Sequence, residues 1–170
     1  MRIAVYAGTF DPVTAGHLSV IERADKLFDR IIVLVAVNPT KAPLFTVDDR
    51  VAMIREAVGH LEHVECAATD GWVVDYARAH DAAFLVRGVR GATDADYETA
   101  LAQMNHAVAP EITTVFLPAH SDLSEVSSTR LKEMARLGQE IRPYCPVGVE
   151  RRLREKLGAA EQEARHAYAV

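Results

Sequence analysis

Apolar runs without polar interruption alternate along the chain with segments whose apolar positions lie three or four residues apart. The clearest run covers residues 31–37, where Ile, Val, Leu and Ala follow one another without a polar position. A strand covered on both faces has this pattern, whereas a strand with one solvated face alternates between apolar and polar residues. Residues 31–37 therefore predict a buried strand of a parallel sheet, which Asn38 and Pro39 would end.

Shorter apolar segments predict four more strands, at residues 3–6, 64–67, 83–86 and 113–117. Segments with helical spacing predict helices at residues 18–28, 47–58, 73–79, 94–106, 127–137 and 147–157. Strands and helices alternate in this order through most of the chain, which is typical of an α/β domain. We therefore predict one domain with a Rossmann-like, open, parallel five-stranded sheet and helices on both faces.

Local signals support several of the predicted helix ends. Thr46 with Asp49 three residues later resembles a capping pair, and Gly138 is a suitable C-terminal cap. Residues 1–157 are expected to form the domain. Residues 158–170 form a tail rich in Ala and Glu that would extend the last helix or fray, and the lack of an apolar stripe favours fraying.

Composition excludes several classes of protein. The chain has 170 residues, a formal net charge of −5 and two widely separated cysteines, Cys66 and Cys145. The acidic balance argues against a nucleic-acid partner, and the cysteines fit a reduced compartment better than a structural disulfide. The run at residues 31–37 is too short to cross a bilayer, and Asp11 interrupts any signal-peptide core. We expect a soluble, cytoplasmic protein without a membrane partner.

The segment from Gly8 to His17 combines a strand end, a polar loop and a helix start. Gly8 and Gly16 permit close backbone approach, and Thr9 adds a hydroxyl donor. Backbone N–H groups, the positive end of a helix and one imidazole then surround a single point, which suits a phosphate. A lone Gly-His pair would more simply be a loop with an exposed histidine, but the whole segment favours the phosphate site.

A second and a third polar group also follow predicted strands. Lys41 lies in the loop after residues 31–37 and would pair with a phosphate there, although loop lysines are usually solvated. Consecutive hydroxyls at residues 127–129 offer side-chain and backbone donors to a polyphosphate at a helix start. Ordinary N-capping by Ser127 or Ser128 is the alternative interpretation of that group.

Two arginines form the fourth group. Arg87 and Arg90 emerge from the predicted strand at residues 83–86 with only Gly and Val between them. They would clamp anionic oxygens in a bidentate way, or else form a surface turn by pairing with Asp94 or Asp96. Because parallel strands end at one edge of the sheet, all four groups are expected to converge there and to bind a phosphate-rich ligand.

A metal site is a poorer interpretation of the remaining candidates. His60, His63 and Cys66 lie near one another in sequence, but their spacing does not match a metal-binding motif. We therefore predict no metal ligands from protein side chains. Arg151, Arg152 and Arg154 lack interleaved aromatic residues and indicate a solvated helix face or a subunit contact.

Several of these motifs together resemble a known family. The first and the serine-rich segments are similar to the two signatures of the nucleotidyltransferase superfamily. The wider set resembles bacterial pantetheine-phosphate adenylyltransferases from about residue 2 to residue 157: Gly8-Thr-Phe-Asp-Pro12, Thr14-Ala-Gly-His17, Asn38-Pro-Thr-Lys41, Gly71-Trp-Val-Val-Asp-Tyr-Ala77, Val86-Arg-Gly-Val-Arg90, Tyr97-Glu98, Met104-Asn105 and Val126-Ser-Ser-Thr129 with Lys132.

The resemblance implies adenylyl transfer from ATP to 4′-phosphopantetheine, which gives dephospho-coenzyme A and pyrophosphate with the help of Mg²⁺. It implies a homohexamer and coenzyme A as a feedback ligand. By position, substrate contacts would come from Thr9, Lys41, Val73 and Arg87. The ATP site would comprise Thr9, Phe10, His17, Gly88, Val89, Arg90, Glu98, Leu123, Ser124, Glu125, Val126, Ser127, Ser128 and Thr129.

The implied chemistry needs no general base, because the substrate phosphate is already a nucleophile. His17 would stabilise charge on the α-phosphate, Lys41 would hold the incoming phosphate, and Arg90 would bind the leaving pyrophosphate, with Mg²⁺ bridging phosphates. Two alternatives remain open at this point: a nucleotidyltransferase with another phosphate acceptor, and a nucleotide-binding regulator that has lost catalysis. A class I aminoacyl-tRNA synthetase is a third possibility suggested by the His17 motif, but the chain is short for one and shows no basic surface for tRNA.

Overall fold

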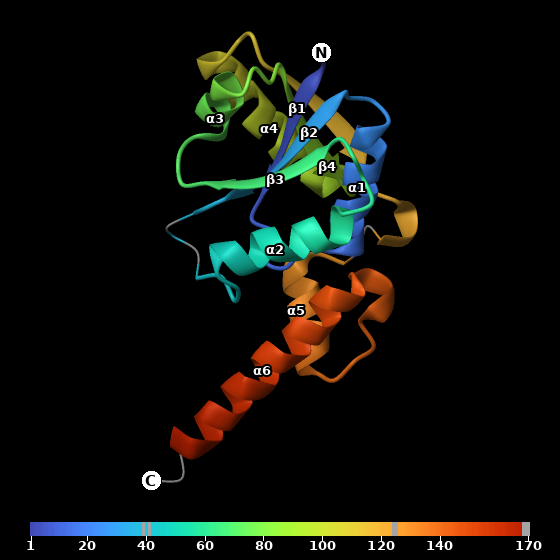
Figure 1. The fold of residues 1–170 in the computed structure, drawn as a ribbon, viewed down its shortest axis with the longest axis vertical. Coiled ribbons are helices and arrows are strands. Elements are labelled where there is room, and N and C mark those ends of the chain that lie inside the picture. The colour runs from blue at the N-terminus through green and yellow to red at the C-terminus, as the bar shows by residue number, and fades with distance from the viewer. Residues whose placement is uncertain (39, 41, 124–125, 168–170) are drawn as a thin grey trace.

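The computed structural model describes residues 1–38, 40, 42–123 and 126–167, and within these residues the core is a five-stranded parallel sheet (Figure 1). The strand order is β3-β2-β1-β4-β5. Every pair of neighbouring strands is parallel. The strands are β1 (Ile3–Gly8), β2 (Arg30–Ala36), β3 (Val64–Thr69), β4 (Phe84–Val89) and β5 (Thr113–Pro118).

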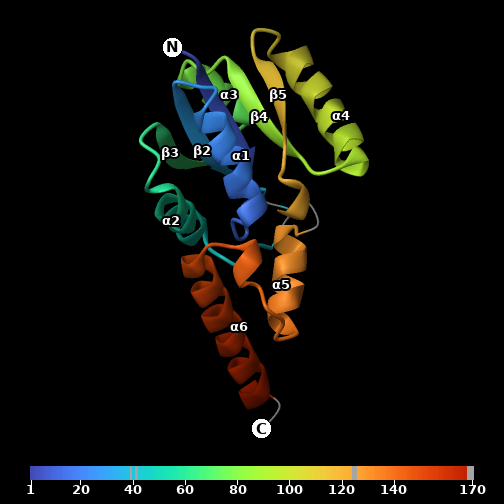
Figure 2. The same cartoon turned by 90° about the vertical axis from the view of Figure 1, so that its right-hand side faces the viewer.

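Helices connect the strands and cover both faces of the sheet (Figures 1 and 2). In the described part of the chain they are α1 (Ala15–Asp25), α2 (Val47–Val58), α3 (Val73–Ala79), α4 (Ala92–Val108), α5 (Ser128–Arg136) and α6 (Val147–Ala167), with short 3₁₀ turns at Ser121–Leu123 and Arg142–Tyr144. The predicted fold class, α/β and Rossmann-like with helices on both faces, is confirmed.

Alternate residues of β1 enter two different hydrophobic clusters, because successive side chains of a strand point to opposite faces. Ala4 and Tyr6 belong to the larger cluster, which also takes side chains from α1, α2, α5 and α6. Val5 and Ala7 belong to the smaller cluster, beneath α3. The uninterrupted apolar character of β1 and β2 therefore has the cause that the sequence pattern indicated, burial on both faces.

Several element boundaries differ from the prediction by a few residues, and two of these differences affect the loops discussed below. Helix α1 begins at Ala15 rather than residue 18, because Thr14 caps it and accepts a hydrogen bond from the backbone N–H of His17. Strand β4 continues three residues past Val86, because its last residues pair with Phe116, Leu117 and Pro118 of β5. Arg87 is therefore held in a strand and does not lie in the loop that the sequence suggested.

The sequence left open whether the tail extends the last helix or frays, and in the described residues it extends the helix. Helix α6 continues past Gly158 to Ala167 and projects away from the sheet (Figure 1). Ala, Glu, Gln and Arg dominate this stretch and are strong helix formers, so propensity extends the helix without an apolar stripe. In the part of the chain that the structure describes, no helix is both long and apolar enough to traverse a lipid bilayer.

Candidate active site

A cleft of about 580 Å³ opens at the carboxyl ends of β1 and β4. These two strands are neighbours at the centre of the sheet, where the connections turn from one side to the other: β2 and β3 lie on one side of β1, β4 and β5 on the other. Ligands of open α/β sheets bind at this reversal of strand order. The cleft therefore lies where the fold itself favours a binding site.

Three of the four groups of residues predicted to bind phosphate line this cleft. The loop between β1 and α1 contributes Gly8, Thr9, Phe10, Asp11, Thr14, Gly16 and His17; β4 and α4 contribute Arg87, Gly88, Arg90, Asp94, Tyr97 and Glu98; the start of α5 contributes Val126, Ser127, Ser128, Thr129 and Lys132. The remaining group contains Lys41, which lies outside the described residues, but Ala42 and Pro43 directly after it line the cleft.

His17 lies in the first turn of α1 and completes a capping box with Thr14. The backbone N–H of Thr14 donates to Nδ1 of His17 at 3.0 Å, and the hydroxyl of Thr14 accepts from the backbone N–H of His17 at 3.4 Å. Because a backbone N–H can only donate, Nδ1 must be the unprotonated nitrogen. The ring proton then sits on Nε2, so His17 can donate a hydrogen bond to a ligand.

The surroundings of His17 keep its ring neutral. Burial, followed by the positive charges of Arg90 and Arg87, lowers the pKa of His17 to about 4. The ring packs edge-on against Phe10, with 5.0 Å between the ring centroids. A neutral N–H donor at a helix N-terminus is suited to an oxyanion and would not serve as a proton donor near neutral pH.

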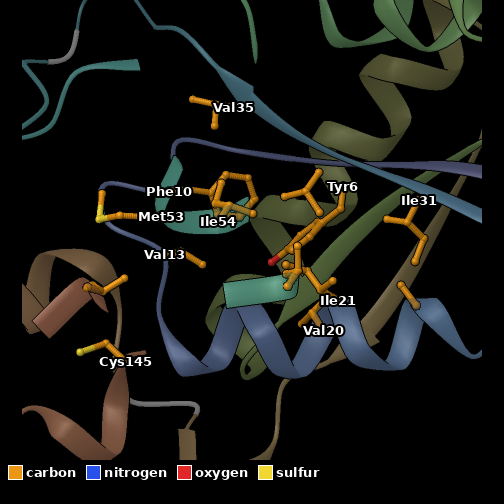
Figure 3. Packing of buried hydrophobic residues seen from close by; sticks show 14 of the residues in the cluster. Tyr6, Phe10, Val13, Val20, Ile21, Ile31, Val35, Met53, Ile54 and Cys145 are labelled. Atoms are coloured by element: carbon orange, nitrogen blue, oxygen red, sulfur yellow. The ribbon is translucent and has the colours of Figure 1, made fainter. Parts of the chain in front are cut away.

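Phe10 holds the first loop against the core. Its side chain is 2% exposed and packs in the larger cluster with Tyr6 and Met53 (Figure 3). Its backbone is left-handed, with φ of 46°. A Cβ atom on Gly8 would lie only 3.0 Å from the ring of Phe10. A side chain at position 8 would therefore crowd the ring of Phe10, and glycine lets the loop fold back over the strand end without that contact.

The two arginines that follow the predicted strand, Arg87 and Arg90, form ion pairs on the cleft wall. Arg87 donates through Nε and Nη2 to the two oxygens of Glu98, at 2.5 and 2.8 Å, and through Nη1 to the carbonyl of Ala7 at 2.8 Å. Burial alone would lower the pKa of Arg87, but its hydrogen bond to Glu98 and the charge of Glu98 raise it. This arginine is thus fixed by a predicted ATP-site residue.

Arg90 is paired differently. It forks onto Asp94 at 2.7 and 3.1 Å, which is one of the two surface pairings that the sequence left open. Both residues nevertheless line the cleft. The hydrogen bond to Asp94 raises the pKa of Arg90, so the guanidinium stays charged and an incoming phosphate would compete with Asp94 for it.

The start of α5 both caps its helix and faces the cleft. The hydroxyl of Ser127 accepts from the backbone N–H of Arg130 at 3.1 Å, which is the ordinary capping role. The hydroxyl of Ser128 donates to the carbonyl of Pro12 at 2.8 Å and joins α5 to the first loop. The start of α5 therefore lines the same cleft as His17, and the N-terminus of a helix favours an anion.

Asp11 and Lys132 belong to motifs that stand out in the sequence, but neither residue was predicted to have a role in the site. Asp11 is 4% exposed and accepts hydrogen bonds from the backbone N–H groups of Leu44 and Phe45, both at 2.9 Å, and from Nζ of Lys132 at 2.8 Å. Burial alone would raise the pKa of Asp11, but these donors outweigh it and hold the pKa below its ordinary value. The sequence signal that could have identified this carboxylate is an acidic residue, Asp11, placed directly between the apolar residues Phe10 and Pro12.

Not every predicted site residue reaches the cleft. Ser124 and Glu125 lie outside the described residues. Val73 opens α3 and packs against the smaller core cluster, so it is not part of the cleft wall, and Val89 and Leu123 are also absent from that wall. The carbonyl of Leu123 lies close behind Gly16, 3.4 Å from where a Cβ would stand.

The described residues contain no group of three or more His, Cys, Asp or Glu side chains placed to hold a metal ion. The carboxylates of the cleft each face a cation: Asp11 faces Lys132, Asp94 faces Arg90, and Glu98 faces Arg87. The chemistry of this wall is therefore that of fixed cations and N–H donors, which suits anionic oxygens.

Known proteins are similar to this chain along most of its length. A family model described as cytidylyltransferase-like matches residues 5–134. A phosphopantetheine adenylyltransferase from Heliobacterium modesticaldum is 44% identical over 158 residues, which cover 93% of this chain and 94% of that protein. Proteins of the same name from Brucella ovis and Anaeromyxobacter sp. are 44% and 45% identical and cover 92% of this chain.

A solved structure shares the fold at low sequence identity. It is a putative nicotinate-nucleotide adenylyltransferase from Vibrio parahaemolyticus, with a TM-score of 0.65 and 16% identity, covering 90% of this chain and 99% of that one. At this identity the likeness extends to the fold alone.

Proposed function

The chain belongs to the phosphopantetheine adenylyltransferases, within the cytidylyltransferase-like family, and we propose that its cleft joins ATP to 4′-phosphopantetheine. The products are 3′-dephospho-coenzyme A and pyrophosphate, and the reaction is a step of coenzyme A biosynthesis. One observation carries the assignment of the site: a neutral N–H donor, two arginines and a helix N-terminus from distant parts of the chain line a single cleft.

In this reaction an oxygen of the substrate phosphate attacks the α-phosphorus of ATP. A new P–O bond forms as the bond from the α-phosphorus to the bridging oxygen of pyrophosphate breaks. The nucleophile is already ionised near neutral pH, so the protein need supply only position and charge stabilisation. The reaction therefore requires no general base from the protein.

His17 acts on the charge that develops at the α-phosphate. Its Nε2–H donates to a nonbridging oxygen, while the hydrogen bond from Thr14 to Nδ1 fixes the ring and its tautomer. A donor whose orientation is set before the substrate arrives loses nothing to reorganisation during the reaction. The low pKa of His17 keeps this donor neutral under cellular conditions.

The remaining phosphate contacts come from two sides of the cleft, one for each substrate. Thr9, Lys41 and Arg87 hold the incoming phosphate, with Arg87 aimed by its fork onto Glu98. Arg90 and the hydroxyls of Ser127 to Thr129 bind the pyrophosphate end of ATP. For Val73, which packs away from the cleft wall, we propose a contact with the more distant pantetheine arm.

Mg²⁺ fits this site only as a companion of ATP. Each cleft carboxylate among the described residues already faces a cation, so the protein offers the metal no set of unpaired oxygens. Bound to phosphate oxygens, the ion would neutralise charge on the polyphosphate. We propose that it enters with the nucleotide and that Arg90 and Lys132 supply the protein's share of positive charge.

The proposal extends to assembly, regulation and location. Large apolar side chains stay exposed along α4 and on the edge strand β5, at Tyr97, Met104, Val108 and Phe116. A cytoplasmic homohexamer would cover such a surface, and coenzyme A would compete for the same cleft as its precursor. Size-exclusion chromatography with light scattering tests the hexamer, and a monomer at micromolar concentration would contradict it.

Pyrophosphate release is the decisive assay for the activity. Purified protein is given ATP, Mg²⁺ and one acceptor at a time: 4′-phosphopantetheine, nicotinate mononucleotide or a sugar phosphate. Rapid release with phosphopantetheine alone supports the proposal. Faster release with another acceptor would reassign the substrate, and tight ATP binding without release would indicate a regulator.

A further inference from the structure

We propose that Asp11 is a positioning residue that connects the ATP side of the cleft to the phosphopantetheine side, so that the two sides are ordered together. This inference rests on the proposed function, because it uses that function to assign the two sides. Asp11 itself touches neither substrate in the proposal. It acts through the groups bound to its carboxylate.

The carboxylate of Asp11 joins three segments that are far apart in the sequence. Oδ1 accepts from the backbone N–H of Phe45, and Oδ2 accepts from the backbone N–H of Leu44 and from Nζ of Lys132. The partners lie 33, 34 and 121 residues away. One side chain therefore ties the first loop to the segment that follows Lys41 and to helix α5.

Each of the tied segments reaches a different substrate. Ala42 and Pro43 line the cleft immediately before Leu44, in the segment proposed to hold the phosphopantetheine phosphate. Lys132 also lines the cleft, one turn of α5 beyond the hydroxyls proposed to hold pyrophosphate. A lysine ammonium has three donors, so Lys132 can keep its bond to Asp11 and still donate to an ATP oxygen.

Burial makes this connection strong. The side chain of Asp11 is 5% exposed and that of Lys132 is 18% exposed, so the ion pair is shielded from water. A second tie runs parallel to it: the buried Arg50, on α2, donates to the carbonyl of Thr9 at 2.9 Å. Arg50 keeps the first loop attached to α2 when Asp11 is changed, so loss of Asp11 should loosen residues 42–45 without detaching the loop.

Binding measurements on three variants separate the two halves of the connection. Asp11→Asn keeps the size of the side chain but removes the charge, and its single carbonyl oxygen cannot replace both carboxylate oxygens. Lys132→Met removes only the ATP half, and the double variant removes both. Glu65→Gln is the matched control, because it breaks a forked ion pair with Arg30 that lies outside the cleft wall.

We expect Asp11→Asn to weaken 4′-phosphopantetheine binding by about tenfold or more, since hydrogen bonds to charged groups are the strong ones. Lys132→Met should weaken ATP binding while phosphopantetheine affinity stays within about twofold. The double variant should bind phosphopantetheine as Asp11→Asn does, and Glu65→Gln should match the wild type. If Asp11→Asn binds phosphopantetheine normally, or if Lys132→Met reproduces its whole effect, the inference is wrong.

Amide hydrogen exchange keeps the test decisive if Asp11→Asn fails to fold. In the wild type, a non-hydrolysable ATP analogue should slow exchange at the amides of Leu44 and Phe45, and in Lys132→Met it should not. Exchange at these amides that ignores the analogue in the wild type would overturn the proposal. Wild-type turnover is measured in parallel: its absence would refute the proposed function, whereas turnover with an unaffected Asp11→Asn refutes only this inference.

Discussion

Substitution of His17 tests the proposed chemistry most directly, and the structure allows its two roles to be separated. His17→Ala removes both the Nε2–H donor and the acceptor for the backbone N–H of Thr14. His17→Asn is expected to keep that acceptor, because an asparagine oxygen lies about as far along the side chain as Nδ1 does. It lacks the reach to present a donor in the cleft. The pair therefore distinguishes a catalytic donor from a helix cap.

The magnitudes follow from what each variant loses. Removing one preorganised donor to an oxyanion lowers kcat by about 10²–10³-fold, or about 3–4 kcal/mol of barrier. Losing the capping contact destabilises the protein by about 1 kcal/mol. We expect the full kcat loss in both variants, with reduced stability in His17→Ala and near-normal stability in His17→Asn. Steady-state pyrophosphate release and urea unfolding measure the two quantities.

The pH dependence provides an independent check. With a pKa of about 4, roughly 0.1% of His17 is protonated at pH 7, so kcat should show no inflection near 6.5. The unfolded chain takes up a proton at this histidine below about pH 6.5 while the folded chain does not, so stability falls from about pH 6.5 toward pH 4. His17→Asn should lose that component. A His17→Ala enzyme with normal kcat, or a wild-type inflection at 6.5 that vanishes in it, would refute the assignment of a neutral donor.

Three further predictions concern the rest of the site. Arg87→Lys cannot span both oxygens of Glu98, so KM for phosphopantetheine should rise about tenfold while KM for ATP changes less, and equal changes in a two-substrate kinetic analysis would contradict the division of the cleft. Ser127→Ala removes the cap of α5 and should destabilise the protein by about 1 kcal/mol in thermal unfolding, whereas an unchanged Tm would show that the cap contributes nothing. The pKa of Asp11 lies below its ordinary value of 3.8, so its ionised form stabilises the fold above that pH and the contribution is lost as pH falls through the lower value. Urea midpoints of Asp11→Asn between pH 3 and pH 7 should therefore depend less on pH than those of the wild type, and parallel curves would argue against this contribution.

Elements whose pattern is set by burial were predictable from the sequence. The unbroken apolar run of β2, rich in β-branched residues, is typical of a strand covered on both faces, and α2 was predicted with its observed bounds, which Thr46 helps to mark as its cap. The approximate site was also predictable, because parallel strands deliver their following loops to one edge. The ends of strands and helices were harder to predict. The last residues of β4, for example, are in a strand because β5 pairs with them.

Pairings between distant side chains were beyond the sequence pattern. Nothing local indicates that Arg87 forks onto Glu98, since several carboxylates follow it at similar spacing, and for Arg90 the sequence left Asp94 and Asp96 open as partners. The role of Asp11 depends on a partner 121 residues away. The sequence left the end of α6 open, because the lack of an apolar docking stripe favours fraying whereas the intrinsic preference of Ala and Glu favours helix.

The wide separation of these partners also affects how the enzyme is made. During synthesis the loop with Asp11 and His17 leaves the ribosome long before α5, which carries the lysine that completes it. A polypeptide halted before residue 127 would have the sheet and the phosphopantetheine side of the cleft, but it would lack the serine-lined start of α5. We therefore expect a nascent chain not to retain ATP until translation is nearly complete, which spares the cell a half-made enzyme that sequesters the nucleotide.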